Sequence, residues 1–190
     1  MALTALPERS GDRPGISPFG MGHIWIPLAG RRAAVAGLSM HPACKPVSVA
    51  LQRATCAAVM VAGPIVLPGR QTGFRAPLEP EAWSELLMQW RSRVGRWDDM
   101  VLYHRPQPHR SGFAVLLLRN GRGLAFVRVT PDAGRTAHEF AVMRGVHAGR
   151  PRTFRIALPL AQGTVAGYGW LAVESGPNYP LGAVRRPEVR

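Results

Sequence analysis

The sequence predicts an α+β protein: an antiparallel, five-stranded sheet with one crossing helix, preceded by a helical, basic N-terminal extension. Three observations predict this class. A strongly amphipathic helix follows Pro80, short β-type runs alternate with turn residues after Trp97, and Asn120-Gly121 lies between two of those runs. An Asn-Gly pair between apolar runs is a strong hairpin signal. Strands joined by hairpins, with a single crossing helix, favour an antiparallel sheet.

The N-terminal half reads as a tail and a helical extension. Residues 1–22 hold four Gly and three Pro, which predicts a mobile tail, and residues 23–97 are expected to form the basic extension. A helix is expected from Val47 to Val61, since apolar residues recur there at three- and four-residue steps. Those residues are Val47, Leu51, Ala54, Ala58 and Val61. Two interpretations stay open: the helix packs on the domain, or it lies on a membrane surface with Arg53 on its polar side.

The helix that follows Pro80 has the clearest pattern in the chain. Acidic residues lie near its start and basic residues near its end, which complements the helix dipole. One apolar face is made of Trp83, Leu86, Leu87, Trp90, Val94 and Trp97. Three tryptophans on one face suit either a partner groove or the core, and we expect the core.

Residues 98–177 should supply the sheet. The expected strands are Val101 to Tyr103, Phe113 to Leu118, Leu124 to Val129, a run around Phe154 to Leu158, and Trp170 to Glu174. In the third strand, alternation puts Leu124, Phe126 and Arg128 on one face. A helix is expected from about Thr136 to His147, with Phe140, Met143 and Val146 facing inward.

The charge is strongly basic and unevenly distributed. The formal net charge is +13, and between Arg13 and Leu78 there are seven basic residues and no acidic one. Either these are scattered solvated charges of an arginine-rich composition, or Arg31, Arg32 and Arg53 form a surface for anionic lipid or nucleic acid. Only three aromatic residues, Phe19, Trp25 and Phe74, accompany them, so specific nucleic-acid binding is not expected.

Several classes of protein are disfavoured by the composition. The longest uncharged apolar stretch, Ala54 to Pro68, is 15 residues long and is interrupted by Gly63-Pro64. This stretch is too short for a membrane span. Two cysteines form no disulfide framework, and the six histidines lack the spacing of a metal site. We expect a cytoplasmic protein, either free or peripheral to the inner membrane face.

Three segments carry a family resemblance: AFVRV (125–129), HEFAVMRGV (138–146) and GWLAVESGP (169–177). With the predicted order of elements, residues 98–177 resemble the N-terminal lobe of the aminoglycoside phosphotransferase-like kinases, which include choline-kinase and sugar-kinase relatives. The resemblance implies that Arg128 stands where a Lys grips the nucleotide phosphates and that Glu139 orients it by ion pairing. It also implies a hinge around Pro177, with 178–190 as a hinge stub or disordered tail.

The sequence departs from that family in three ways. Arg replaces Lys at 128, the loop from Arg105 to Gly112 has no G-x-G-x-x-G pattern, and no segment matches the C-terminal lobe with its catalytic Asp and Mg²⁺-binding Asn and Asp. We therefore expect a truncated or split phosphotransferase-like lobe that is not catalytic alone. ATP and Mg²⁺ would bind only with a separate C-lobe polypeptide, and an exposed lobe face predicts such a partner or self-association. The alternative is a non-enzymatic basic protein that docks on an anionic membrane surface or nucleic acid.

Overall fold

The computed structural model describes residues 14–18, 23–40, 45–104, 112–150 and 156–176. The predicted loop from Arg105 to Gly112, except Gly112 itself, and the predicted hinge stub 178–190 lie outside these residues, as does Phe19. In the described part of the chain, no helix has both the length and the apolar character needed to cross a bilayer.

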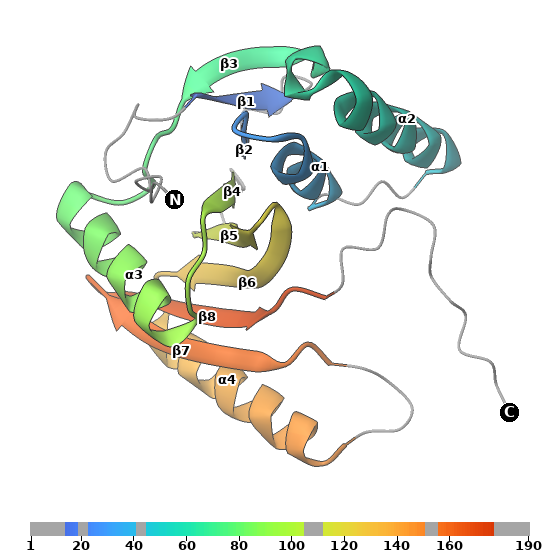
Figure 1. The fold of residues 1–190 in the computed structure, drawn as a ribbon. Coiled ribbons are helices and arrows are strands. Elements are labelled where there is room, and N and C mark those ends of the chain that lie inside the picture. The colour runs from blue at the N-terminus through green and yellow to red at the C-terminus, as the bar shows by residue number, and fades with distance from the viewer. Residues whose placement is uncertain (1–13, 19–22, 41–44, 105–111, 151–155, 177–190) are drawn as a thin grey trace, which may run out of the picture.

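Four α-helices, one short 3₁₀ helix and eight strands make up the described fold (Figure 1). In chain order they are β1 (Pro14–Pro18), β2 (Ile24–Pro27), α1 (Arg31–Ser39), α2 (Pro46–Ala62), η1 (Pro64–Val66), β3 (Gly69–Gly73), α3 (Pro80–Arg93), β4 (Asp99–Tyr103), β5 (Phe113–Arg119), β6 (Arg122–Thr130), α4 (Ala133–Ala148), β7 (Pro159–Val165) and β8 (Tyr168–Glu174). The strands form one antiparallel sheet in the order β3-β1-β2-β4-β5-β6-β8-β7. The predicted α+β class with an antiparallel sheet is therefore confirmed.

The predicted number of five strands has to be corrected to eight. Strands β4 to β8 appear in the expected order with α4 between β6 and β7, but β2 pairs with β4 and continues the sheet through β1 and β3. Part of the expected tail and part of the expected helical extension thus belong to the sheet. These strands are short and bounded by Pro or Gly, which are turn signals in a sequence. They form strands because they pair with neighbouring strands, and their own sequence pattern does not predict them.

The fourth predicted strand lies later in the chain than expected. Residues 156–158 are not in a strand, and β7 begins at Pro159. The alternating run that ends at Leu158 suggested a strand, but the pairing with β8 starts only at Pro159 opposite Val173. Leu158 instead ends the preceding segment, where its carbonyl oxygen accepts a hydrogen bond from the amide of Glu174 at 2.8 Å.

Helix α3 buries its tryptophan face against one side of the sheet, as predicted. Trp83, Leu86 and Trp90 have no exposed side-chain surface and pack with inward-facing residues of β5, β6 and β8. Trp83 and Trp90 meet edge to face with ring centroids 5.9 Å apart. The Trp170 indole donates a hydrogen bond to Gln89 Oε1 at 3.0 Å, which fixes α3 to β8.

The other side of the sheet carries α1 and α4. Helix α1 packs on β2 and β4 through its small residues, and a Cβ at Gly37 would lie only 2.9 Å from Cγ2 of Ile26. A Cβ at Gly121, in the predicted hairpin turn, would lie 2.5 Å from Cβ of Arg32; Gly121 has φ of +69° and Asn120 has φ of +54°. Two positive φ values are those of a type I′ turn, so the predicted hairpin is confirmed.

Helix α2 packs mainly on α1 (Figure 1), and its Val59 joins the buried cluster that also contains Ile16 of β1 and Ile26 of β2. Its inner side carries Val49, Gln52, Cys56 and Val59, and only Val59 is fully buried. The stripe that was expected to pack on the domain points outward instead: Val47 is 80% exposed, Leu51 60% and Val61 77%. The helix was predicted correctly and it does pack on the domain, but through the side opposite the expected stripe.

Candidate functional site

The two residues singled out by the family resemblance meet across β6 and α4. Ala125, Val127 and Val129 are completely buried in the tryptophan core, so alternation turns Arg128 to the opposite face of the sheet. There the Arg128 guanidinium forms an ion pair with the Glu139 carboxylate through Nη2 and Oε2. The family resemblance implied this pairing, and the structure brings both residues together.

The position of Glu139 is fixed by the first turn of α4. Asp132 caps the helix, since its Oδ1 accepts a hydrogen bond from the amide of Arg135 at 2.8 Å. Thr136 is buried, and its hydroxyl donates to the backbone carbonyl of Asp132 at 3.0 Å and lies 3.1 Å from the Thr130 hydroxyl. These bonds hold the start of α4 on the end of β6, so Glu139 lies about one turn along, facing Arg128.

Glu139 holds two cations at once. Besides Arg128, it accepts a hydrogen bond from Arg135 Nε at 3.2 Å, four residues earlier on the helix. The Arg128 side chain is 39% exposed and that of Glu139 27%, so the pair lies at the surface and is open to a ligand. Partial burial, and then the charge of Arg135, lower the pKa of Arg128 from its usual value. An arginine nevertheless stays charged at any physiological pH.

Arg128 keeps an unused hydrogen-bond donor. Its Nε is buried and has no hydrogen-bond partner among the described residues. A buried donor without a partner is unfavourable, and an acceptor on a ligand or a water molecule would relieve it. The guanidinium can remain paired with Glu139 through Nη2 while the exposed part of the side chain, at Nη1, meets an anion.

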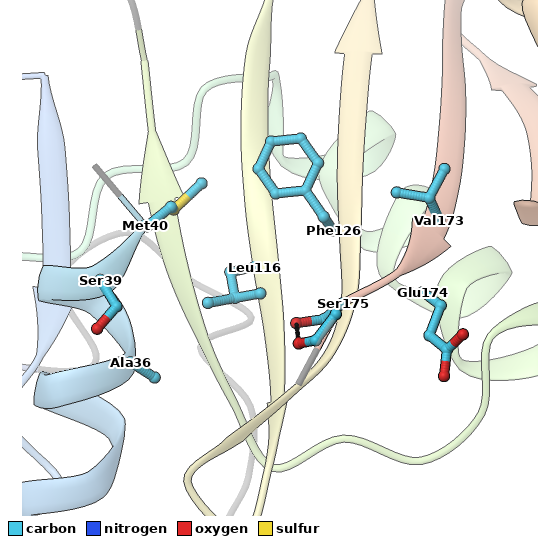
Figure 2. A pocket seen from close by; sticks show the side chains of 9 residues that line it. Ala36, Ser39, Met40, Leu116, Phe126, Val173, Glu174 and Ser175 are labelled. Atoms are coloured by element: carbon cyan, nitrogen blue, oxygen red, sulfur yellow. Dashed lines mark hydrogen bonds between the residues drawn. The ribbon is translucent and has the colours of Figure 1, made fainter. Parts of the chain in front are cut away.

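A cavity of about 260 Å³ lies on the same face of the sheet (Figure 2). Leu116 of β5 and Phe126 of β6 form its floor, and Val173 to Gly176, at the end of β8, form one wall. Ala36, Ser39 and Met40 of α1 and its C-cap form the facing wall. Phe126 precedes Arg128 by two residues on one strand, which places the apolar floor about 7 Å from the cation along the sheet.

Sequence reasoning found the ion pair but not the cavity. Phe126 lies on the Arg128 face of the sheet, as strand alternation predicts. An aromatic residue two positions before Arg128 on that face is the one feature of the sequence that indicates the apolar floor of the cavity. Leu124, expected on that face too, packs against the tryptophan core, because a register shift between Leu117 and Leu118 gives β6 an extra residue there. The wall from α1 had no sequence signal, since it depends on how a distant segment folds back.

The other predicted site residues lie away from this cavity. Arg31 and Arg32 are exposed at the start of α1, and Arg53 is exposed on α2. Of the three, Arg31 contacts α2: its Nη1 donates a hydrogen bond to the backbone carbonyl of Met60 at 3.2 Å. Arg32 lies beside Gly121 of the β5–β6 turn instead.

No metal site or reactive thiol emerges from the described residues. No group of three His, Cys, Asp or Glu residues in the described ranges is placed to hold a metal ion. Cys56 is half-buried on the inner side of α2, and burial raises the pKa of its thiol. A raised pKa leaves less thiolate at neutral pH, so Cys56 is poorly suited to nucleophilic chemistry.

Comparison of the chain with protein-family models, with curated proteins and with solved structures found no match.

Proposed function

We propose that this chain is the nucleotide-binding half of a phosphotransferase-like protein, similar to the N-terminal lobe of small-molecule kinases. The observation that carries the proposal is the ion pair of Arg128 and Glu139 beside the cavity floored by Leu116 and Phe126. Two of the segments that carry the resemblance, AFVRV and GWLAVESGP, both line that cavity. The arrangement β4-β5-β6-α4-β7-β8, in which one helix crosses between β6 and β7, further supports the proposal.

The roles in this proposal follow from the chemistry of each group. The apolar floor suits the flat face of a nucleobase, which stacks well on an aromatic ring such as Phe126. The cavity volume of about 260 Å³ suits a base and not a whole nucleotide, so the phosphates would lie outside the cavity toward Arg128. Arg128 would hold phosphate oxygens by charge-assisted hydrogen bonds, and Glu139 would fix the guanidinium in place.

Arg128 differs chemically from the lysine of such kinases. Lysine is a compact charge at the end of a flexible stem, whereas arginine offers a rigid fork of donors suited to two oxygens at once. The fork can bind Glu139 with Nη2 and a phosphate with Nη1. We therefore expect nucleotide binding to depend on arginine at this position, and an Arg128→Lys variant to bind more weakly.

Catalysis is assigned to a second lobe and not to this chain. The described residues do not fit Mg²⁺, because no group of carboxylates or histidines converges near Arg128. The metal ligands and the residue that activates the phosphate acceptor would come from a C-lobe polypeptide. This chain by itself would bind nucleotide, weakly, and transfer nothing.

Thermal unfolding with and without ADP tests this proposal. A ligand that binds only the folded state stabilises it by an amount that grows with the ratio of its concentration to Kd, so millimolar ADP should raise Tm. Arg128→Ala should abolish the rise. Arg122→Ala, at an exposed arginine on the same strand, should leave it intact. An equal rise in wild type and Arg128→Ala, or no rise in wild type, would contradict the proposal.

The alternative function, docking of a basic protein on an anionic surface, is supported by a separate observation, the exposed apolar face of α2. That face belongs to a different surface of the molecule from the cavity beside Arg128.

A further inference from the structure

Exposed apolar residues gather on α2 and η1. Among the described residues, nine large hydrophobic side chains are exposed, and six of them lie in the 20 or so residues from α2 to η1. These six are Val47, Leu51, Met60, Val61, Ile65 and Val66. The three others, Met88, Val142 and Leu158, lie in separate elements. Single exposed apolar residues need no explanation, but a contiguous group of this kind marks an interaction site.

The outward face of α2 is apolar along its whole length. At 100° per residue, the residues that point directly away from α1 fall on one side of the helix. All are aliphatic: Val47, Ala50, Leu51, Ala54, Ala57, Ala58, Val61 and Ala62. The polar Gln52 is on the inner side, where its Nε2 donates a hydrogen bond to the backbone carbonyl of Leu38 at 2.5 Å. The helix is therefore apolar on its outward face as well as on the side that packs on α1, where Val49, Cys56 and Val59 lie.

The charged residues within α2, just before it and bound to it are all positive. Lys45 precedes α2, Arg53 is exposed at the border of the apolar face, and Arg31 is bound to the carbonyl of Met60. No acidic residue occurs anywhere between Arg13 and Leu78. A surface with an apolar centre and a purely cationic border is complementary to lipid, whose anionic headgroups lie above an apolar layer.

The same charges argue against two other occupants. A second copy of the chain would bring its own cations to the contact, where like charges repel. Nucleic acid would meet an aliphatic face and no stacking platform, because Trp25 and Phe74, the described aromatic residues of the acid-free segment, are buried against each other. The convex side of one helix also offers no groove for a protein partner.

We propose that the outward face of α2 and η1, formed by Val47, Leu51, Val61 and Ile65, docks on an anionic lipid bilayer. The helix would lie in the plane of the interface with its apolar face among the acyl chains and with Arg53 and Lys45 at the level of the headgroups. About 25 Å of helix would make the contact. This lipid-binding face is independent of the nucleotide site, which lies on the sheet on the other side of α1.

Flotation with lipid vesicles tests the proposal on the full chain. Vesicles of phosphatidylcholine containing about one-third phosphatidylserine should retain the protein, and pure phosphatidylcholine should retain little. A Leu51→Gln, Val61→Gln double variant should lower the partition coefficient about tenfold or more. A second variant, Lys45→Gln with Arg53→Gln, should lower it severalfold and reduce its dependence on salt, because screened charges contribute less.

Matched controls use exposed residues of the same chemical kinds elsewhere. Met88→Gln with Val142→Gln controls for apolar surface, Arg96→Gln with Arg119→Gln controls for charge, and both should bind vesicles like wild type. Arg128→Ala should also bind normally, which separates this result from failure of the nucleotide proposal. The variants of α2 and the matched controls should keep the wild-type Tm, since the changed side chains are exposed.

Three results would overturn the proposal. The first is equal vesicle binding by wild type and the Leu51, Val61 variant, or no binding to anionic vesicles at all. The second is a dimer in sedimentation velocity that the same variant dissociates, which would assign the face to a second copy. The third is retention on DNA that depends on Lys45 and Arg53 without any retention on vesicles.

Discussion

Helices α3 and α2 carry apolar stripes of similar regularity, but the stripe of α3 is buried and that of α2 is exposed. Trp83 and Trp90 of α3 are entirely buried, whereas Val47 and Val61 of α2 are more than three-quarters exposed. A stripe of regular period identifies a face of a helix, but it does not say what covers that face. In α3 the covering surface is the sheet of the same domain. In α2 it lies outside the described chain, and we infer a lipid surface.

The contrast has a local origin in the residues opposite each stripe. On the side of α3 opposite its tryptophans lie charged residues, among them Glu81, Glu85 and Arg91, which are more stable in contact with solvent. Helix α2 has only Arg53 as a charged side chain within its bounds, and mostly small or aliphatic residues elsewhere. With little to choose between its faces, α2 is oriented by α1, whose Arg31 and Leu38 offer bonds to Met60 and Gln52.

The largest effect is expected when one residue of the apolar stripe is replaced by Ala in each helix. Trp83→Ala should lower the free energy of unfolding by about 3–5 kcal/mol, because it leaves a cavity in a fully buried site. Leu51→Ala should change it by no more than about 0.5 kcal/mol, since that side chain is 60% exposed. Urea denaturation measures both. Comparable losses in the two variants would show that α2 packs through its stripe and would break the comparison.

A smaller test compares the start of α4 with the start of α3. Asp132→Ala removes the side-chain cap of α4 and should cost about 0.5–2 kcal/mol, while Asp132→Asn should cost little because Asn caps as well as Asp. Glu79 makes no capping hydrogen bond to α3, so Glu79→Ala should change stability by less than about 0.5 kcal/mol. The same urea series measures these values. An Asp132→Ala variant as stable as wild type would show that the Asp132 cap does not position Glu139.

Elements with strong local signals were predictable from the sequence. The start and the buried face of α3, the Asn120-Gly121 turn and the crossing helix α4 agree with expectation, because capping, period and turn chemistry act within a few residues. Strands β1 to β3 were not predictable. They contain Pro and Gly and depend on pairing between segments up to about 80 residues apart, which local pattern does not encode.

The candidate site divides in the same way. Arg128 and Glu139 could be named because each belongs to a short motif, and β6 and α4 follow one another in the chain. The cavity beside them could not, because its walls come from α1 and from the end of β8, separated by more than 130 residues. The orientation of α2 likewise depends on its hydrogen bonds with α1, and the periodicity of the sequence does not predict these bonds.

The most direct test of nucleotide binding at Arg128 is a titration with ADP followed by amide chemical shifts of the isotope-labelled chain. A nucleotide site on the sheet predicts concentration-dependent shifts at Leu116, Phe126, Arg128 and Val173, and none of comparable size along α2. The shifts should vanish in Arg128→Ala. Shifts confined to Arg31, Arg32 and Arg53 would show only diffuse attraction of an anion to basic residues, and would contradict a nucleotide site on the sheet.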